Sequence, residues 1–344
     1  VHYEKEHLVV QDFSGKIGHS DLKTTLHYYL GEDQAIKKRD NLFSFNSNFL
    51  DIDELINYNP LPGEETKKEN HDSIFNIYEL PFTDMSFFVG IKELNYHQHT
   101  LADFYTKMRT TPNHFLHIDT FSTSLAGGDI NTKGYFNGSN PNLIYFSPDM
   151  HIHKIDLDQV LLKFDNFGQD EVVSDNLHGE FTGHITGKVH MHTDLVPIIE
   201  DSEIHIDAHI EKGKLENYPM LQDFSEYFKD KNLESVKFDT LENKIDMVNG
   251  VITVPKMTIN STLGFLEVSG VQDADYNYEY KISIPWKMVT QAAASKLFKR
   301  KRNQDNTGED EIQYENKKTK YVTLKLKGDS VDYKISLSKR KKKD

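Results

Sequence analysis

The sequence predicts a mainly β protein, in which a long antiparallel sheet curls into an open half-pipe and carries a few short amphipathic helices. Three observations predict this fold. Apolar and polar residues alternate over many segments, which indicates strands with one buried and one solvated face. Helical patterns are few and short. A block of strand patterns recurs 108 residues further along the chain, and such repeats build an array that grows along one axis.

The clearest alternation is SEIHIDAHIE, residues 202–211, where apolar residues occupy one parity and charged residues or histidines the other. Residues 183–192 and 275–284 alternate in the same way. An open sheet of about 14 to 18 strands twists and curls, so the apolar parity is expected to line its inside. The residues predicted to form this lining are Ile185, Val189, Met191, Ile204, Ile206, Ile210, Tyr276, Tyr278, Tyr280 and Ile282.

Two hairpins are predicted from turn residues between apolar runs. Asn249-Gly250 is the strongest short-range hairpin signal in the chain. Gly328-Asp329 separates YVTLKLKG from SVDYKISL. The apolar residues of these two strands are expected to face one another, and they are Val322, Leu324, Leu326, Val331, Tyr333, Ile335 and Leu337.

Two longer helices are predicted, over residues 219–229 and 286–299. Pro219 suits the first turn of the first helix. Trp286 begins a stripe of apolar residues spaced by three and four, which is the helical period. Lys299 and Arg300 close the second helix, where cations oppose the negative end of the helix dipole.

An internal repeat organises the N-terminal half. The segment from Leu8 matches the segment from Leu116 at an offset of 108, and LDIDELI from Leu50 matches IDLDQVL from Ile155 at an offset of 105. Asp51 and Asp156 hold equivalent places before short helical patterns, so we expect them to cap helices. The unit is therefore several strands followed by a short helix begun by aspartate.

These patterns divide the chain into segments of different kinds. Residues 1–58 and 74–179 are two repeat units, 59–73 and 302–320 are polar linkers, 180–301 form a C-terminal β region, and 321–344 form a terminal hairpin with a basic tail.

The composition excludes several classes of protein. The net charge of −14 argues against a nucleic-acid binder, because such binding relies on neutralising phosphates. The chain has no cysteine, which removes disulfides and thiolate catalysis. Basic residues cluster only near the C-terminus, where they suit contact with a membrane or a partner or merely form a solvated tail. The residues predicted for docking are Trp286, Lys299, Arg300, Arg302, Lys339, Arg340 and Lys341.

Histidines occur in pairs at 97/99, 151/153, 190/192 and 205/209. Two histidines on one face of a strand are able to supply two ligands of a zinc site. Here they share their face with lysines and carboxylates, so a polar outer surface is the better interpretation. We expect no metal, no cofactor and no catalytic residue, and a metal-dependent hydrolase is the least favoured alternative.

The run from Gly213 to Val289 resembles the C-terminal region of the AsmA family in the form found in Bacteroidota. It contains a strand–Asn-Gly–strand unit before VPKMTINSTLG, a closing Ser-Gly, and a tyrosine-rich strand that enters a helix at Pro285. LDIDELI and IDLDQVL resemble the repeated strand-to-helix turns of that family. The similarity is best over residues 180 to 300 and extends over the chain.

The resemblance implies a repeating β-groove whose apolar interior holds phospholipid acyl chains without catalysis. It implies a periplasmic protein, tethered by an N-terminal inner-membrane helix that this chain lacks, and a role in lipid transport between inner and outer membranes or in outer-membrane biogenesis. The ends of the groove would meet a membrane surface or envelope proteins. We expect the chain to be a piece of a longer protein, missing its beginning. The alternative is a β-rich envelope scaffold or assembly factor without lipid cargo.

Overall fold

The computed structural model describes residues 1–33, 35–36, 41–56, 76–96, 99–163, 175–222, 224, 232–286, 312, 320–329 and 332–338. Within these described residues, seventeen strands form one mixed sheet that is not closed, with 72% of the described residues in strands and 7% in helices. The prediction of a mainly β fold with few short helices is therefore confirmed. The predicted linker 59–73 and nearly all of 302–320 lie outside the described residues.

The chain divides into two compact units, and each is considered by itself. Unit 1 comprises Val1–His153 and Ile185–Ser202, and unit 2 comprises Lys154–His184 and Glu203–Asp344. Strands β10 (Leu177–Met191) and β11 (Pro197–Glu216) contribute residues to both units.

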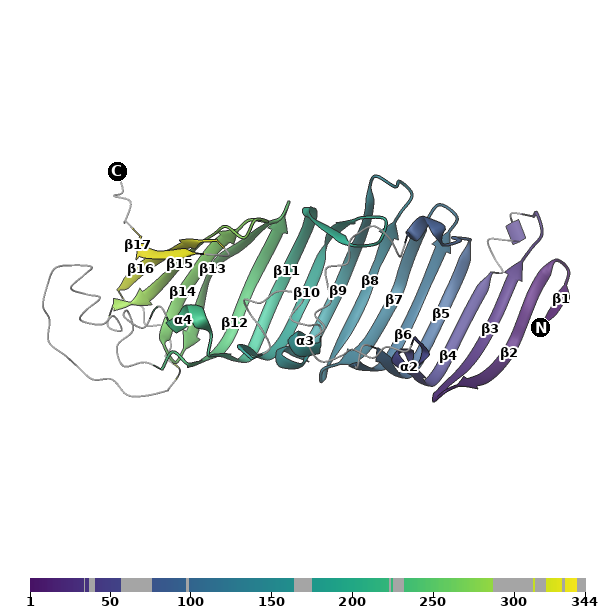
Figure 1. Cartoon of the computed structure of the whole chain (residues 1–344), viewed down its shortest axis with the longest axis horizontal. Helices are drawn as coiled ribbons and strands as arrows, with labels where there is room; N and C mark the ends of the chain where they lie inside the picture. The colour runs from purple at the N-terminus through teal and green to yellow at the C-terminus, as the bar shows by residue number, and fades with distance from the viewer. Residues whose placement is uncertain are drawn as a thin grey trace, which may run out of the picture. The chain divides into compact units, whose positions relative to one another are not determined.

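In unit 1, each strand pairs with the strand that follows it in the chain (Figure 1). Strands β4 and β5 are parallel, and the other pairs of unit 1 named here are antiparallel. The strands are β1 (His2–Glu4), β2 (His7–Ile17), β3 (Ser20–Tyr29), β4 (Leu42–Asp51), β5 (Met85–Tyr96), β6 (His99–Thr111), β7 (Phe115–Leu125), β8 (Gly128–Asn137) and β9 (Ile144–Asp156), whose last three residues belong to unit 2. Helix α2 (Ile52–Leu55) and the 3₁₀ turn η1 (Ile77–Glu79) separate β4 from β5.

The internal repeat of the sequence is also a repeat of structure. Strands β2 and β7 begin at equivalent positions, and the irregularity between Val10 and Phe13 recurs between Ile118 and Phe121. The Asp51 side chain accepts a hydrogen bond of 2.9 Å from the N–H of Glu54 in α2. Asp156 accepts one of 3.1 Å from the N–H of Gln159 in α3 (Leu157–Lys163). Both predicted caps are therefore confirmed.

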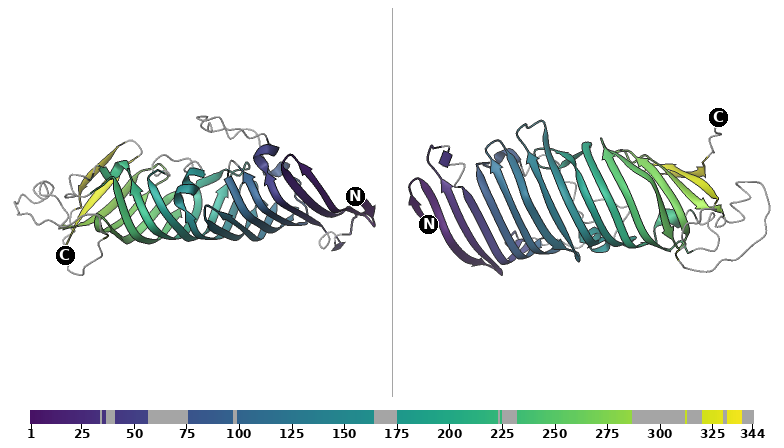
Figure 2. Two further views of the ribbon diagram at one scale, coloured as in Figure 1. Left: turned by 90° about the horizontal axis from the view of Figure 1, so that it is seen from below. Right: turned by 180° about the vertical axis from the view of Figure 1, so that it is seen from behind.

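In unit 2, the strands from β11 onward pair in chain order and antiparallel (Figure 2). They are β12 (Ser235–Val248), β13 (Val251–Ser261), β14 (Gly264–Gln272), β15 (Tyr278–Pro285), β16 (Tyr321–Gly328) and β17 (Tyr333–Leu337), and the short helix α4 (Pro219–Gln222) precedes β12.

Both predicted hairpins are present. Asn249 and Gly250 have positive φ angles of 52° and 73° and join β12 to β13, which is the backbone that a two-residue turn of type I′ requires. In the second hairpin, Leu326 stands opposite Ile335 and Leu324 opposite Leu337, as predicted. Val331 lies outside the described residues.

Other predictions require correction or lie beyond the described residues. Tyr276 does not belong to a strand: it lies in the turn before β15 with a φ of 62°, and its N–H donates to the carbonyl of Asp273. Of the helix predicted over 219–229, the described part is α4 together with Phe224. Residues 287–299 of the second predicted helix lie outside the described residues.

Among the described residues, buried hydrophobic side chains form one large and two small clusters. The large cluster, in unit 2, contains Phe224, Leu233, Val236, Leu263, Tyr278, Ile284, Val322, Leu324 and Leu326. The small clusters lie in unit 1, and each has three buried residues: Leu50, Ile91 and Leu94 in one, and Ile77, Phe136 and Ile144 in the other. The core of unit 1 is therefore divided between two places.

Candidate functional site: the apolar face of each unit

The register of β11 and β12 places the apolar residues of SEIHIDAHIE on one face of the sheet. Ile204 stands opposite Met247, Ile206 opposite Ile245, and Ile210 opposite Leu241. Side chains of directly opposed residues project from the same face of a sheet. The isoleucines of SEIHIDAHIE therefore continue into an apolar row on the neighbouring strand.

The other face of β11 and β12 is a row of ion pairs. His205 Nδ1 lies 2.6 Å from Asp246, and His209 Nδ1 lies 2.9 Å from Glu242. Hydrogen bonding to Asp246, and then to Glu203, raises the pKa of His205 above its usual value, because the carboxylates favour the charged imidazolium. Asp207 pairs with Lys244 at 3.2 Å. These side chains are exposed or half-buried, so this is the solvated face.

The apolar face continues across β13 to β15. Ile259 stands opposite Leu266, and Val268 opposite Ile282. Gly270 stands opposite Tyr280, whose ring covers the glycine so closely that a Cβ there would lie 2.0 Å from it. The aromatic ring thus fills the space that the glycine leaves open.

Unit 2 contains a sealed and an unsealed part of this face. Ile284 is 0% exposed and Tyr278 is 6% exposed, because Phe224, Leu233 and Leu263 belong to the same packed cluster. Tyr280 and Ile282 pack against that cluster. By contrast, Ile204, Ile206 and Ile210 are only half-buried. The structure therefore places Tyr278 inside a closed core. Of the predicted lining in unit 2, the β11 isoleucines lie on a surface that the described residues do not seal.

Unit 1 has an aromatic face that the sequence analysis missed. One row across its strands contains Phe45, Val89, Thr106 and Phe121, each opposed to the next. The adjacent row contains Phe43, Phe87, Met108 and Ile118. Seven of these eight side chains are phenylalanine or β-branched. The alternation of phenylalanine with polar residues in LFSFNS was the available signal.

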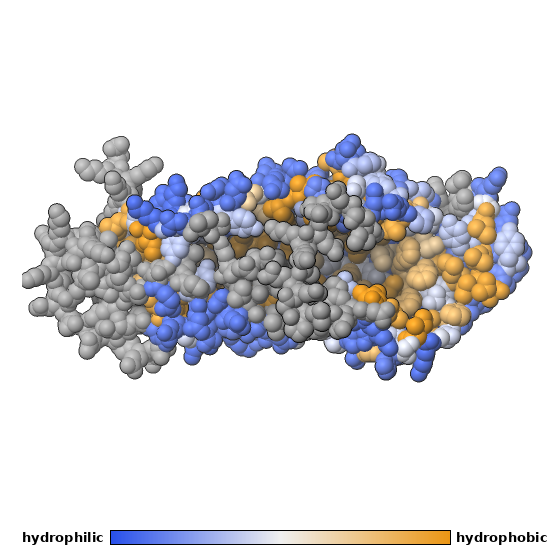
Figure 3. Space-filling model, in the orientation of Figure 1, coloured by the Kyte–Doolittle hydropathy of each residue, from blue (hydrophilic) through white to orange (hydrophobic). Residues whose placement is uncertain are grey.

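The middle of the unit 1 face is not sealed by the described residues. The Leu50 cluster lies at the strand ends next to α2, and the Phe136 cluster lies at the opposite strand ends. Between them Phe43, Phe45, Phe87 and Met108 are half-buried. In the view of Figure 3, hydrophobic residues occupy the hollow of this unit, and hydrophilic residues follow its edges. Ile185, Val189 and Met191 of β10 are half-buried too, and Met191 packs against the Phe136 cluster.

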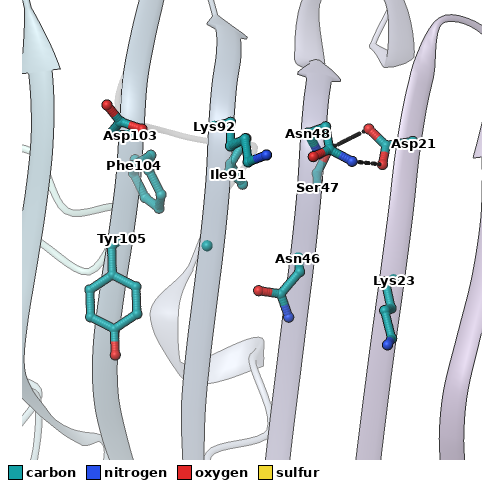
Figure 4. A pocket seen from close by; sticks show the side chains of 11 residues that line it. Asp21, Lys23, Asn46, Ser47, Asn48, Ile91, Lys92, Asp103, Phe104 and Tyr105 are labelled. Carbon is teal, nitrogen blue, oxygen red and sulfur yellow. Dashed lines mark hydrogen bonds between the residues drawn. The ribbon is translucent and has the colours of Figure 1, made fainter.

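The opposite, polar face of unit 1 bears a hollow of about 440 Å³ (Figure 4). It forms because Gly90 interrupts a row of side chains between Asn46 and Tyr105. At its rim, Asp21 accepts hydrogen bonds from the N–H groups of Asn48 (2.9 Å) and Phe49 (2.8 Å). The bond from Phe49 contributes most to a lowered pKa of Asp21, although burial acts in the opposite direction. Asp21 of β3 therefore binds the backbone of β4 at Asn48 and Phe49, so its role here is structural.

The predicted docking residues do not form a described surface. Trp286 packs against the large core cluster of unit 2, and its backbone N–H donates to the carbonyl of Lys320 at 2.7 Å. Its ring is thus engaged in packing. The basic residues predicted to act with it, Lys299, Arg300, Arg302, Lys339, Arg340 and Lys341, lie outside the described residues.

The described part of the chain contains no helix that is both long and apolar enough to span a bilayer. The partly exposed apolar faces are the candidate ligand-binding surfaces of the two units. No family model, no curated protein and no solved structure matches this chain.

Proposed function

We propose that the protein binds phospholipid acyl chains along the apolar faces of its units, without catalysis, and that this binding serves lipid transport between the inner and outer membranes or outer-membrane biogenesis. One observation carries the proposal. Apolar rows that cross several strands of each unit stay half-exposed among the described residues. Contiguous exposed apolar surface of this extent marks a ligand, partner or membrane site in soluble proteins.

The dimensions suit acyl chains. A strand rises about 3.4 Å per residue, so the apolar parity from Ile204 to Ile210 spans about 20 Å. One leaflet of a bilayer core is about 15 Å thick, which is the length over which an acyl chain stays apolar. A chain laid along one strand would therefore remain in contact with side chains such as Ile206 and Ile245.

The energetics favour occupation of the face. Burying an isoleucine side chain is worth about 1.5–3 kcal/mol. Ile204, Ile206 and Ile210 are half-buried in the unit alone, so a ligand gains only the part of this energy that remains. Several such side chains on each strand still provide a substantial driving force, and it is non-directional, which suits flexible hydrocarbon.

The lipid class and the cellular location rest on the resemblance to the AsmA family. That resemblance favours phospholipid as cargo, the periplasm as location, a tether to the inner membrane, and partners or a membrane surface at the ends of the groove. The sealed core around Ile284 favours the alternative of a β-rich scaffold without cargo, because there the apolar face packs against protein. One experiment distinguishes a lipid-binding protein from a scaffold without cargo.

The test is mass spectrometry of lipids extracted from the purified protein, with two matched variants. Ile206→Arg places a charge on the apolar face, and His205→Arg places the same charge one residue away on the solvated face. We expect phospholipid to co-purify with the unmodified protein and with His205→Arg, and to fall several-fold in Ile206→Arg. A scaffold would carry no phospholipid, and equal loss in both variants would contradict the assignment of the lining.

A further inference from the structure

The hollow on the polar face of unit 1 lies over a glycine (Figure 4). Gly90 of β5 stands between Asn46 of β4 and Tyr105 of β6. Beyond the chain neighbours of Gly90, Asn46 Oδ1 is the one described atom that would lie within 4 Å of a Cβ there, at 3.1 Å. The missing side chain therefore leaves a recess of about 440 Å³.

One side of the hollow is an aromatic ring. Tyr105 is 42% exposed, and Figure 4 shows its ring face on beside the hollow. Its partners on the adjacent strands are Gly90 and Ser122, which are too small to cover the ring. Aromatic residues on a sheet ordinarily gain stability from large cross-strand partners. Because Tyr105 stands between two small partners, its ring is accessible to a ligand.

A second side of the hollow is polar, because the ladders of three strands are interrupted at one level. Asn48 of β4, Lys92 of β5 and Asp103 of β6 lie between paired residues but have no pair of their own in the described ladders. Asp103 has a φ of 49°, and the register of β6 with β7 shifts at this point. Irregularities of this kind re-aim side chains. All three side chains line the hollow (Figure 4), and Asn48 Nδ2 donates to the Asp21 carboxylate at 3.0 Å.

The charges around the hollow cancel. Two carboxylates and two ammonium groups line it, and they belong to Asp21, Asp103, Lys23 and Lys92. This balance favours neither an anion such as phosphate nor a cation. Lys92 is able to donate hydrogen bonds, Asp103 to accept them, and the amide of Asn46 to do both. The hollow is therefore complementary to a neutral ligand that carries several hydroxyl groups and one apolar face.

We propose that the hollow binds a hexopyranose ring of a carbohydrate. The C–H face of the sugar lies on Tyr105, beside Gly90, and the hydroxyl groups exchange hydrogen bonds with Asn46, Lys92 and Asp103. Sugars of the glucose configuration fit best, because their equatorial hydroxyls leave axial C–H bonds on the ring faces. The volume of about 440 Å³ is at the small end of the range for ligand pockets, about 300–1,000 Å³. The site lies on the polar face and is independent of lipid binding.

Saturation-transfer difference NMR of the whole chain tests the proposal, with cellobiose and chitobiose as probes. Ring protons of at least one disaccharide should receive saturation, and mannitol, which has hydroxyl groups but no ring, should receive none. Tyr105→Ala should weaken binding about tenfold, since one stacking contact is lost. Gly90→Gln, which fills the recess, should abolish it. Tyr135→Ala is the matched control, because Tyr135 of β8 is 36% exposed and lies outside the hollow. Circular dichroism checks that the variants are folded.

Cellohexaose distinguishes the two sources of such a ring: tighter binding than that of cellobiose indicates a polysaccharide, and equal binding indicates a small sugar. Any of three results would overturn the proposal. Neither disaccharide receives saturation, mannitol receives as much as the disaccharides, or Tyr135→Ala weakens binding as strongly as Tyr105→Ala. The phospholipid content of Tyr105→Ala should equal that of the unmodified protein, so the sugar site and the lipid-binding face are tested separately.

Discussion

Tyr280 lies across Gly270, its direct partner between β14 and β15, so that the ring occupies the place of a side chain the glycine lacks. Pairs of this kind let an aromatic residue pack flat against a sheet. Here the pair lies next to the sealed core of unit 2, with Tyr280 in contact with that cluster. The glycine is thus a packing residue.

The Gly270–Tyr280 pair predicts that Gly270→Val destabilises the protein by about 1–3 kcal/mol, the usual cost of overpacking. The new side chain collides with the Tyr280 ring, which has to leave its place. Urea unfolding monitored by circular dichroism measures the change. Gly15→Ala is the matched control, because a Cβ at Gly15 meets its nearest atoms at 3.9 Å. Equal stability of Gly270→Val and the unmodified protein would contradict the packing role.

Substitutions at Ile284 and Ile204 should affect stability and lipid binding to different extents. Ile284 is 0% exposed, so Ile284→Ala should cost about 2–5 kcal/mol, as core truncations do. Ile204 is half-buried on the unsealed face, so Ile204→Ala should cost clearly less in the unfolding free energy. Lipid extraction at a temperature where both variants are folded should give the opposite ranking. If Ile284→Ala loses more lipid than Ile204→Ala, the sealed and unsealed parts are wrongly distinguished.

His205 should make a small, pH-dependent contribution to stability. Its pKa is raised by Asp246, so the stabilising ion pair is fully present below the pKa of the unfolded chain, about 6.5, and is lost as pH rises through the raised value. Because the side chain is 46% exposed, solvent keeps the effect weak. Proton NMR titration of the imidazole should show the raised pKa, and Asp246→Asn should lower it. An unchanged titration in Asp246→Asn would contradict the pairing.

The two helix caps, Asp51 and Asp156, should contribute equally to the stability of the protein. Asp51→Ala and Asp156→Ala each remove the side-chain acceptor for a backbone N–H in the first turn. A lost cap costs about 0.5–2 kcal/mol. Asp51→Asn and Asp156→Asn, which keep an acceptor, should retain most of the stability in urea unfolding. A strong effect at one position alone would show that the repeat does not use its aspartates in the same way.

Which face a residue occupies was predictable from the sequence, and what covers that face was not. A strand has a period of two, so the parity of Ile204 and Ile206 determines their side of the sheet. The alternation of Tyr278 and Ile284 is the same, yet these two are sealed by residues distant in the chain, Phe224 and Leu233. Periodicity carries no information about such distant partners.

Tyr276 was misplaced because parity alone was applied to a turn. The Asp273 side chain accepts hydrogen bonds from the N–H groups of Asp275 and Asn277, which bends the chain before β15 begins. Aspartate side chains often bind backbone N–H groups in this way. The parallel pairing of β4 with β5 was likewise beyond prediction, since alternation is the same in parallel and antiparallel neighbours.

The sealed core around Ile284 closes the apolar face of unit 2 at β15, where the face is covered by protein. A hydrocarbon chain lying against the β11 isoleucines cannot slide past β15, because Tyr278 and Ile284 are already packed against protein. If unit 2 carries lipid, the number of strands before this core therefore limits how much hydrocarbon its apolar face is able to hold.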